Sequence, residues 1–351
     1  MSTIVILAGG IGKRLWPLSS EALPKPFTPL ITSTPLIVET YERLAQGFPH
    51  ASIAVATSAP HHHAVAALLP GVRTFVEPVS RDTAASIAFV SLQLAREHPN
   101  EPVIFVPADH VVVDTYAFLA CLKYALELVA STGKLIDIGV TPRYSATTLG
   151  YTHIGDIVPE LSRDSMTVHR FLGQVEKPDF ERAREFVASG DYLWHASYFA
   201  WTPQRWIEAF DRHAPELMRA VRVCHEAFER GDGATALECF SSIEPRSVDY
   251  AIAEHIDPND VLIVRGTFGW SDVGSWNELY ELQKSYLDES ENLSRGRAVL
   301  HETAGTFVHN QTDRIVAVFG AHDLVVVVTD DAVLVCPRSR AHELKKLVDR
   351  L

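Results

Sequence analysis

The feature that most constrains the fold is a regular alternation of short apolar runs with longer amphipathic stretches over the first 130 residues. The first apolar run, 3–8, is rich in β-branched residues, and helix-like periodicity follows most of the later runs. Such alternation predicts βαβ units and an α/β fold, with a mostly parallel sheet covered on both faces. We expect strands at 3–8, 52–56, 73–76 and 103–106, and helices at 35–45, 62–69, 83–97 and 116–131.

The character of the chain changes in its second half. Residues 150–254 mix strand patterns at 167–176 and 196–201 with helical patterns at 180–188 and 204–230. This change predicts a domain 1–285 and a small C-terminal β-rich domain 286–351, joined by the polar stretch 287–295. In the second domain we expect a final helix at 340–351, after strands at 298–301, 306–309, 315–319, 324–329 and 332–336.

Composition and charge exclude several classes of protein. The 351 residues are 47% hydrophobic and 21% charged, which is typical of a globular enzyme. A net charge of −13 argues against a broad basic face that binds nucleic acid. The first strand has no basic segment before it, and no apolar run reaches about 18 residues, so we expect no membrane segment and a cytoplasmic protein. Four scattered cysteines without C-x-x-C spacing argue against a zinc site or disulfide framework.

Three polar loops, 9–14, 77–83 and 107–110, directly follow predicted strands. In open parallel sheets, ligands bind where the strands end at their carboxyl edge. The first loop carries three glycines, which let the backbone turn tightly and present N–H groups to an anion. Arg14 and Lys25 add positive charge where a triphosphate would lie.

The spacing of this glycine-rich loop matches neither of two common nucleotide-binding motifs. A P-loop needs an earlier glycine, and Leu15 occupies the place of the third glycine of a dinucleotide fingerprint. An ordinary strand-to-loop turn is the alternative, but the nearby Arg and Pro-Lys favour a phosphate site.

Several further blocks accompany this loop in a fixed order. They are Glu77-Pro78, Arg81-Asp82-Thr83-Ala84, Pro107-Ala108-Asp109-His110, Val175-Glu176-Lys177-Pro178, Tyr192-Leu193-Trp194, Ser247-Val248-Asp249-Tyr250 and the segment 268–276. Together they resemble the sugar-1-phosphate nucleotidyltransferases, and specifically the mannose-1-phosphate guanylyltransferase family. The resemblance implies a Rossmann-like nucleotidyltransferase domain and a C-terminal part similar to a short left-handed β-helix that often supports homodimers. The implied reaction, with Mg²⁺, converts GTP and α-D-mannose 1-phosphate to GDP-mannose and pyrophosphate.

This reaction needs positioning and charge neutralisation, because the sugar phosphate oxygen itself attacks the α-phosphorus. By the resemblance, Arg14 and Lys25 bind the phosphates of the nucleotide and Lys177 reaches the sugar phosphate. Two anions must meet in a protein of negative net charge, so a divalent cation is expected. Asp109 and Asp272 stand in the family's Mg²⁺-binding motifs, and carboxylate oxygens suit a hard cation. A turn or helix-cap role is the alternative for each aspartate.

A carboxylate at Glu77 could accept hydrogen bonds from N1–H and the exocyclic amine of guanine, a pair that adenine does not offer. A surface salt bridge is the alternative for this residue. We expect the backbone of the glycine-rich loop to contribute to nucleotide binding as well. The predicted nucleotide-binding residues are Leu7, Ala8, Gly9, Gly10, Gly12, Lys13, Glu77, Arg81 and Thr83.

The sugar side departs from the family pattern. Gly150 and Glu176 keep their predicted sugar-binding positions, but His195 and Ala196 replace the usual Asn and small polar residue. We expect His195 to contact the sugar and to loosen selectivity among hexose 1-phosphates. In two further departures, Leu149 stands in the family's Tyr-Gly-Tyr loop and Asp82 in its Arg-Asn-Thr loop.

Three alternatives to this function remain. Another hexose 1-phosphate could be the acceptor, another NTP could be the donor, or the chain could be a non-catalytic regulatory paralogue that binds nucleotide sugars. The presence of Lys25, Asp109, Lys177 and Asp272 argues against the non-catalytic alternative.

Overall fold

The computed structural model describes residues 2–10, 12–163 and 166–351. Contacts divide these residues into two compact units, each described below by itself. Unit 1 contains 2–9, 40–108 and 112–270, and unit 2 contains 10–39, 109–111 and 271–351. The contact division thus differs from the predicted domains 1–285 and 286–351, because the segment after β1 groups with the C-terminal residues.

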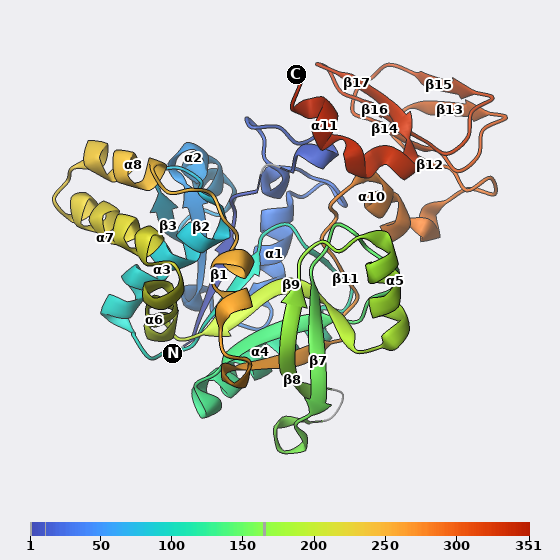
Figure 1. Ribbon diagram of the computed structural model, residues 1–351. Helices are drawn as coiled ribbons and strands as arrows, with labels where there is room; N and C mark the ends of the chain where they lie inside the picture. Colours follow the sequence, from blue (N-terminus) through green and yellow to red (C-terminus); the bar gives the residue numbers. More distant parts are fainter. Residues whose placement is uncertain (1, 11, 164–165) are drawn as a thin grey trace. The chain divides into compact units, whose positions relative to one another are not determined.

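Unit 1 is built on a nine-stranded mixed sheet in the order β3-β2-β1-β4-β9-β6-β10-β8-β7 (Figure 1). The pairs within β3-β2-β1-β4 and the pair β6–β10 are parallel, whereas β9, β8 and β7 run antiparallel to their partners. The α/β class is therefore confirmed. The strands are β1 (Thr3–Leu7), β2 (Ile53–Ser58), β3 (Arg73–Glu77), β4 (Val103–Pro107), β6 (Leu135–Val140), β7 (Tyr151–Ile157), β8 (Val168–Val175), β9 (Tyr192–Trp201) and β10 (Val261–Gly266).

Burial explains why the central strands read as continuous apolar runs. Ile4, Val5 and Ile6 of β1 are fully buried, and all six residues of β2 are buried, as expected where both faces of a sheet are covered. Among the helices, α2 packs on β2 and β3, and α4 packs on β6, β9 and β10. The helices of this part of the chain are α1 (Leu36–Ala45), α2 (Ala59–Leu68), α3 (Asp82–Glu97), α4 (Thr115–Thr132), α5 (Phe180–Ser189), α6 (Pro203–His213), α7 (Pro215–Glu229), α8 (Gly233–Ser241) and α9 (Val248–Ala251).

Three predicted elements differ from the structure. The helix predicted over 204–230 is two helices, α6 and α7, because Pro215 has no N–H to continue α6 and instead begins α7. The helix predicted over 340–351 is a 3₁₀ turn at Arg338–Glu343 followed by the single-turn α11 (Lys345–Val348). The predicted linker contains a short strand, β12 (Leu293–Arg295).

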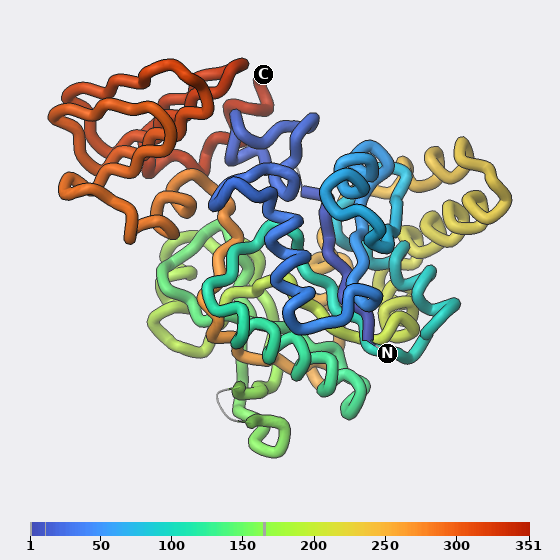
Figure 2. Tube along the Cα trace, turned by 180° about the vertical axis from the view of Figure 1, so that it is seen from behind, coloured from blue at the N-terminus to red at the C-terminus, as the bar shows by residue number. Residues whose placement is uncertain are grey.

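The C-terminal strands of unit 2 form two small sheets, and Figure 2 shows the chain winding between them as a coil. One sheet has the order β12-β14-β16-β17 and the other pairs β13 with β15 in parallel. Val308, Val326 and Val328 fill the interior. This arrangement confirms the β-rich, β-helix-like C-terminal part. Its strands are β12, β13 (Ala298–His301), β14 (Phe307–Asn310), β15 (Val316–Phe319), β16 (Leu324–Val328) and β17 (Val333–Pro337).

A second apolar cluster ties the glycine-rich segment to the C-terminal part within unit 2. Leu15, Leu18 and Leu30 pack in one cluster with Trp276, in α10 (Trp276–Leu282), and with Phe307. The indole N–H of Trp276 donates to the backbone oxygen of Trp16 at 3.0 Å. The cluster therefore anchors the segment that carries Arg14 and Lys25. Two short strands, β5 (Val111–Val112) and β11 (Trp270–Ser271), stand where the chain passes from one unit to the other.

Candidate active site

The glycine-rich loop begins after β1 and continues into unit 2, where Gly12 takes a left-handed conformation with φ of 74°. A Cβ at Gly12 would lie 2.5 Å from Cβ of Lys25, closer than side-chain atoms approach. Glycine is therefore needed here both for its backbone conformation and for this close approach. Lys13 pairs with Asp349 at 2.8 Å, and Ile11 lies outside the described residues.

The residues that lead into this loop come from the end of β1. Leu7 ends the strand, and the N–H of Ala8 donates to the backbone oxygen of Ala56, so both belong to the sheet of unit 1. Gly9 and Gly10 are exposed, which leaves their backbone accessible to a ligand. Nucleotide binding by these residues stays a prediction.

Lys25 joins two of the predicted site residues in unit 2. Its buried ammonium group donates to Oδ2 of Asp109 at 2.8 Å and to the backbone oxygen of Asp272. Burial alone would raise the pKa of Asp109, but the charges of Lys25 and His110 outweigh burial and hold it below its usual value. Three residues far apart in sequence thus form one charged cluster, and Asp109 is ionised in it.

Arg14 and a residue that the sequence analysis missed, Glu278, complete this cluster around the backbone of Gly274. A Cβ at Gly274 would lie 2.7 Å from Oδ2 of Asp272, 3.0 Å from Oε2 of Glu278 and 3.2 Å from Nη2 of Arg14. Burial chiefly, and the charge of Asp272 in addition, raise the pKa of Glu278 to about 7. Ser275 and Glu278 have the S-x-x-E spacing of a helix N-terminus, which was the available signal.

The donor set in unit 2 fits a magnesium ion that is completed by substrate phosphates. Within residues 2–10, 12–163 and 166–351, no three His, Cys, Asp or Glu side chains group as a metal cage would require. Mg²⁺ is commonly held by one or two carboxylates together with phosphates of the substrate. Asp109 contacts Lys25 through its carboxylate, whereas Asp272 does so through its backbone oxygen, and binding of magnesium by the two carboxylates stays a prediction.

We expect Lys25→Met to lower kcat by about two orders of magnitude, the usual effect of removing one group that stabilises charge in a transition state. Methionine keeps most of the length that packs against Gly12 but leaves Asp109 without its ammonium partner. Steady-state kinetics with melting curves would measure the effect. Lys123→Met, on an exposed face of α4, is the matched control. Equal kcat values for the two variants would contradict a catalytic role for Lys25.

Glu77 lies at the end of β3 in unit 1 and is 5% exposed. Its Oε1 accepts a hydrogen bond of 2.5 Å from the hydroxyl of Ser86 in α3. Burial raises the pKa of Glu77 to about 8, so the group is a neutral acid at pH 7. The alternative of a surface salt bridge is wrong, because the side chain is buried. Guanine recognition by a carboxylate stays a prediction and requires that Glu77 lose its proton.

Arg81 and Thr83 tether the start of α3 within unit 1. The guanidinium of Arg81 donates twice to the backbone oxygen of Ser241, at 3.1 and 2.7 Å, and the hydroxyl of Thr83 accepts from the N–H of Val248 at 2.9 Å. Asp82 between them has φ of 64°, a conformation that Asn and Asp adopt more readily than most residues. These contacts give both residues a structural task, and their predicted role in nucleotide binding stays untested.

The predicted sugar-binding residues Gly150, Glu176 and His195 come together in unit 1. A Cβ at Gly150 would lie 3.3 Å from Cβ of His195 and would displace the carboxylate of Glu176, so Gly150 lets that carboxylate come close to the backbone. Lys177 pairs with Glu176 through its ammonium group and is half-exposed. The structure thus brings these residues together, and their role in sugar binding stays a prediction.

The surroundings of His195 include two carboxylates that we did not predict. Its Nδ1 lies 3.2 Å from Oδ2 of Asp137, and its Nε2 makes a close but poorly aligned contact of 2.8 Å with Oδ1 of Asp249. Both ring nitrogens thus face carboxylates and the residue is buried. The ring therefore lies chiefly against carboxylates, and a direct contact with a sugar hydroxyl stays a prediction.

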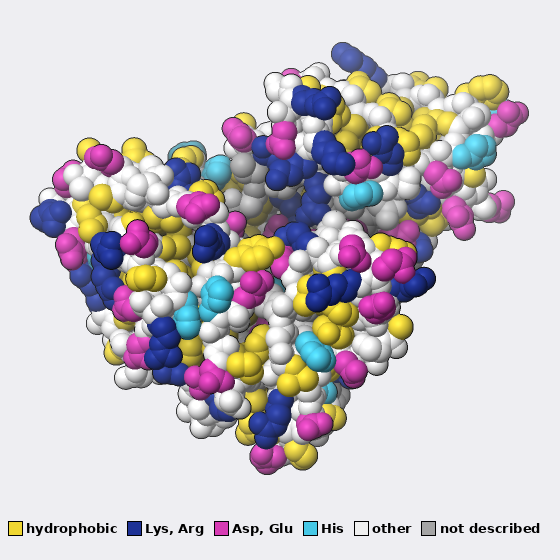
Figure 3. Space-filling model, in the orientation of Figure 1, with side chains coloured by type: hydrophobic (Ala, Val, Ile, Leu, Met, Phe, Trp, Pro, Cys, Tyr) yellow, Lys and Arg dark blue, Asp and Glu magenta, His cyan; other side chains and the backbone are white. Residues whose placement is uncertain are grey.

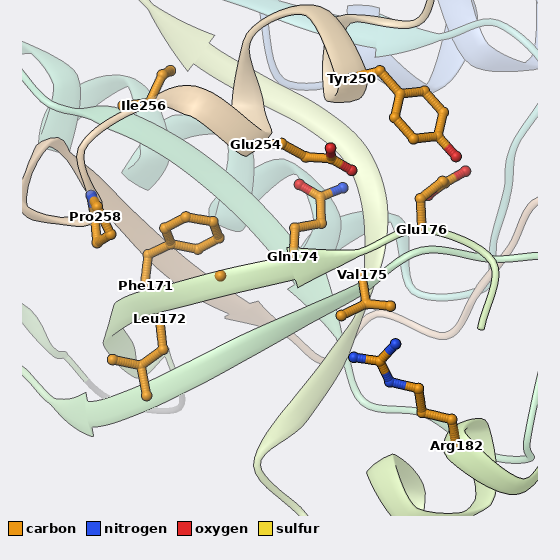
Figure 4. A pocket seen from close by; sticks show the side chains of 11 residues that line it. Phe171, Leu172, Gln174, Val175, Glu176, Arg182, Tyr250, Glu254, Ile256 and Pro258 are labelled. Carbon is orange, nitrogen blue, oxygen red and sulfur yellow. The ribbon is translucent and has the colours of Figure 1, made fainter. Parts of the chain in front are cut away.

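A cavity of about 560 Å³ in unit 1 opens beside Glu176, between β8 and the segment 250–258. Figure 4 shows the side chains of Glu176, Tyr250, Glu254 and Gln174 gathered along it. Burial chiefly raises the pKa of Glu254, with further contributions from nearby carboxylates. Carboxylates, an amide and a phenol suit a ligand rich in hydroxyl groups. The motif that contains Tyr250 is part of the family resemblance, but the sequence predicted no role for Tyr250 itself.

None of the helices in the described part of the chain has both the length and the apolar composition needed to cross a bilayer.

Two protein-family descriptions match nearly the whole chain. Residues 3–289 match the family described as nucleotidyl transferase, and residues 296–351 match the MannoseP isomerase/GMP-like beta-helix domain. The first match covers the mixed sheet and the charged cluster, and the second covers most of the C-terminal strands.

Named relatives are similar along almost the full length. A mannose-1-phosphate guanylyltransferase of Klebsiella pneumoniae is 34% identical over 99% of this chain and 73% of its own length. A putative mannose-1-phosphate guanylyltransferase of Vibrio cholerae is 35% identical over 99% of this chain and 74% of its own length. A crystal structure from Thermus thermophilus, described as a mannose-1-phosphate geranyltransferase, is 34% identical with a TM-score of 0.85, and the match covers 99% of this chain and 98% of that one.

Proposed function

The chain belongs to the nucleotidyl transferase family, and we propose that it transfers GMP from GTP to α-D-mannose 1-phosphate, giving GDP-mannose and pyrophosphate. The observation that carries the proposal is the similarity of 99% of the chain to mannose-1-phosphate guanylyltransferases at 34% identity. The cluster of Lys25, Arg14, Asp109 and Asp272 supplies the charges that the reaction requires.

The proposed reaction is an in-line displacement in which a phosphate oxygen of the sugar phosphate attacks the α-phosphorus and pyrophosphate leaves. No enzyme nucleophile takes part, so the protein acts by orienting the reactants and neutralising charge. Lys25 is a buried ammonium group, and Arg14 is a planar guanidinium that suits two phosphate oxygens. Lys177, paired with Glu176 in unit 1, is the candidate for the sugar phosphate.

The proposal includes a magnesium ion held by the carboxylates of Asp109 and Asp272. When bound, such an ion withdraws charge from phosphate oxygens and neutralises the leaving pyrophosphate. Lys25 holds Asp109 in its ionised form, which is the form able to bind the ion. We also propose that the protein acts in the cytoplasm.

A homodimer, too, is part of the proposal. Apolar side chains are exposed over the C-terminal strands, on the face shown in Figure 3. Four apolar side chains in the C-terminal strands are each more than half exposed: Val299, Phe319, Val333 and Val335. In the proposed homodimer, such side chains would be buried against a second copy of the chain.

Product formation over a grid of four NTPs and several hexose 1-phosphates, with and without Mg²⁺, tests the proposal. We expect GDP-mannose to be formed with the highest kcat/KM, and only with the divalent ion present. A higher kcat/KM for another sugar or nucleotide would assign that substrate instead. Binding of nucleotide sugar without turnover of any pair would favour the non-catalytic alternative.

A further inference from the structure

A histidine buried between two carboxylates joins three elements of unit 1. His195 lies in β9, Asp137 in β6 and Asp249 in α9. The side chains of His195 and Asp137 are each 3% exposed, and that of Asp249 is 11% exposed. None of the roles in metal or phosphate binding proposed above involves these three residues.

The two neighbouring carboxylates favour the charged form of this histidine. Nδ1 lies within hydrogen-bond distance of Asp137, and Nε2 makes an ion-pair contact with Asp249 that is poorly aligned for a hydrogen bond. A neutral imidazole has one N–H and could donate to only one of the two carboxylates, whereas an imidazolium ion can donate to both. Within the described residues, Oδ1 of Asp137 has no hydrogen-bond partner, so the negative charge there depends on His195 for compensation. Burial alone would lower the pKa of His195, but Asp137 and Asp249 outweigh it and hold the pKa well above its ordinary value. In turn, His195 outweighs burial at Asp249 and holds the pKa of that acid at about 2.

Contacts extend from this histidine to the sugar side of the site. The backbone N–H of His195 donates to the oxygen of Gly150 at 2.9 Å, and Gly150 is in close contact with Glu176. Oδ1 of Asp249 also accepts from the amide of Gln174 at 3.1 Å, and Gln174 lines the cavity beside Glu176 (Figure 4). Moving the histidine ring would therefore move Asp249 and Gln174 as well.

We propose that His195 is a positioning residue that, as an imidazolium ion held between Asp137 and Asp249, fixes the Gln174–Asp249 pair beside Gly150 and Glu176 for binding of the sugar phosphate. The inference rests on the proposed function for its ligand. A neutral Asn at this position would leave two buried carboxylates without a cation. His and Asn are therefore not interchangeable here, and the site around His195 is built for a charged side chain.

Two carboxylates contact the histidine ring, and two more lie beyond those contacts. Asp137 and Asp249 contact its ring, Glu176 lies across Gly150, and Glu254 interacts with Asp249. The charges of Asp137 and Asp249 favour the protonated ring. The KM for the sugar phosphate is therefore expected to stay constant from roughly pH 6 to 8 and to rise only at alkaline pH, where the ring loses its proton.

Nitrogen NMR of the wild-type protein labelled at histidine tests the charge state without reference to activity. We expect both ring nitrogens of His195 to carry protons at pH 7 and to keep them at pH 8. A ring that is neutral at pH 7 would overturn the proposal, whatever the substrate is. His195→Asn identifies the signal, and it also serves in the kinetic test.

Kinetics of His195→Asn tests the positioning role. We expect the KM for mannose 1-phosphate to rise about tenfold or more, the effect of losing a hydrogen-bonded charge, while the KM for GTP changes by less than about twofold. His169→Asn is the control, since His169 is equally buried in β8 but contacts Thr167 and a backbone oxygen instead of carboxylates. A double variant with Asp137→Asn restores charge balance and is expected to recover the melting temperature but not the KM.

Equal changes in both KM values, or recovery of the sugar KM in the double variant, would mean that His195 only stabilises the fold and would overturn the proposal. If the proposed function is wrong, the results differ. The wild type would then make no GDP-mannose, while NMR would still show a protonated His195.

Discussion

Asp272→Asn is expected to lower kcat by at least about three orders of magnitude while leaving the fold intact. The amide has the shape of the carboxylate but lacks its charge, and loss of a metal ligand removes several kcal/mol of transition-state stabilisation, at about 1.4 kcal/mol per tenfold in rate. The contact between Lys25 and residue 272 uses the backbone oxygen, so it survives the substitution. Initial rates over a range of Mg²⁺ concentrations, together with melting curves, would measure the effect.

The matched control is Asp331→Asn, the same change at an exposed position of unit 2 far from the cluster in sequence and outside its contacts. It is expected to keep wild-type kinetics. If Asp272→Asn retains near-wild-type turnover at limiting Mg²⁺, the assignment of Asp272 as a metal ligand is wrong, and the aspartate has the turn role considered as its alternative.

The sequence was sufficient for the fold because local signals agreed with tertiary ones. In β1 and β2, apolar β-branched residues form strands that are buried on both faces, so periodicity and burial lead to the same answer. The same agreement failed at Pro215, where a continuous helical pattern hid a break, and at 340–351, where a helix-favouring composition forms only short turns. Helix propensity predicts structure poorly where a single residue or tertiary packing determines whether a helix continues.

The candidate site was predictable to the extent that short motifs carry it. The motifs located Lys25, Asp109 and Asp272, which the structure joins in one cluster. They could not show that Asp137 and Asp249 enclose His195, because these residues are 58 and 54 positions away and no spacing rule links them. Residues that meet only in the folded protein leave no recognisable pattern in the sequence around a motif.

The sequence also could not show that Glu77 is protonated in the folded protein. This protonation leads to the second large effect that we predict. Glu77→Gln should stabilise the protein at alkaline pH. The pKa of Glu77 is raised by burial from 4.5 to about 8, so the folded state keeps a proton that the unfolded state loses between these values. The stability contributed by this group is therefore fully present below pH 4.5 and is lost as the pH rises to 8.

Glutamine resembles the protonated acid, can still accept from Ser86, and does not titrate. The variant and the wild type are thus expected to have similar free energies of unfolding at pH 4.5, and to differ by roughly 5 kcal/mol above pH 8, at about 1.4 kcal/mol per pKa unit. Urea unfolding at a series of pH values would measure the difference. Parallel curves for the two proteins would show that Glu77 is ionised in the fold.

The protonation state of Glu77 also determines how this residue could recognise guanine. Only the carboxylate offers two acceptors to the N1–H and amine of the base, so GTP binding through it must release the proton that burial retains. The affinity for GTP is then expected to weaken about tenfold per pH unit below 8, whereas the affinity for ATP stays constant. Glu77→Gln should remove this pH dependence and narrow the preference for GTP over ATP. If the variant keeps the wild-type preference, other groups read the base, and Glu77 serves as a neutral acid that joins β3 to α3 through Ser86.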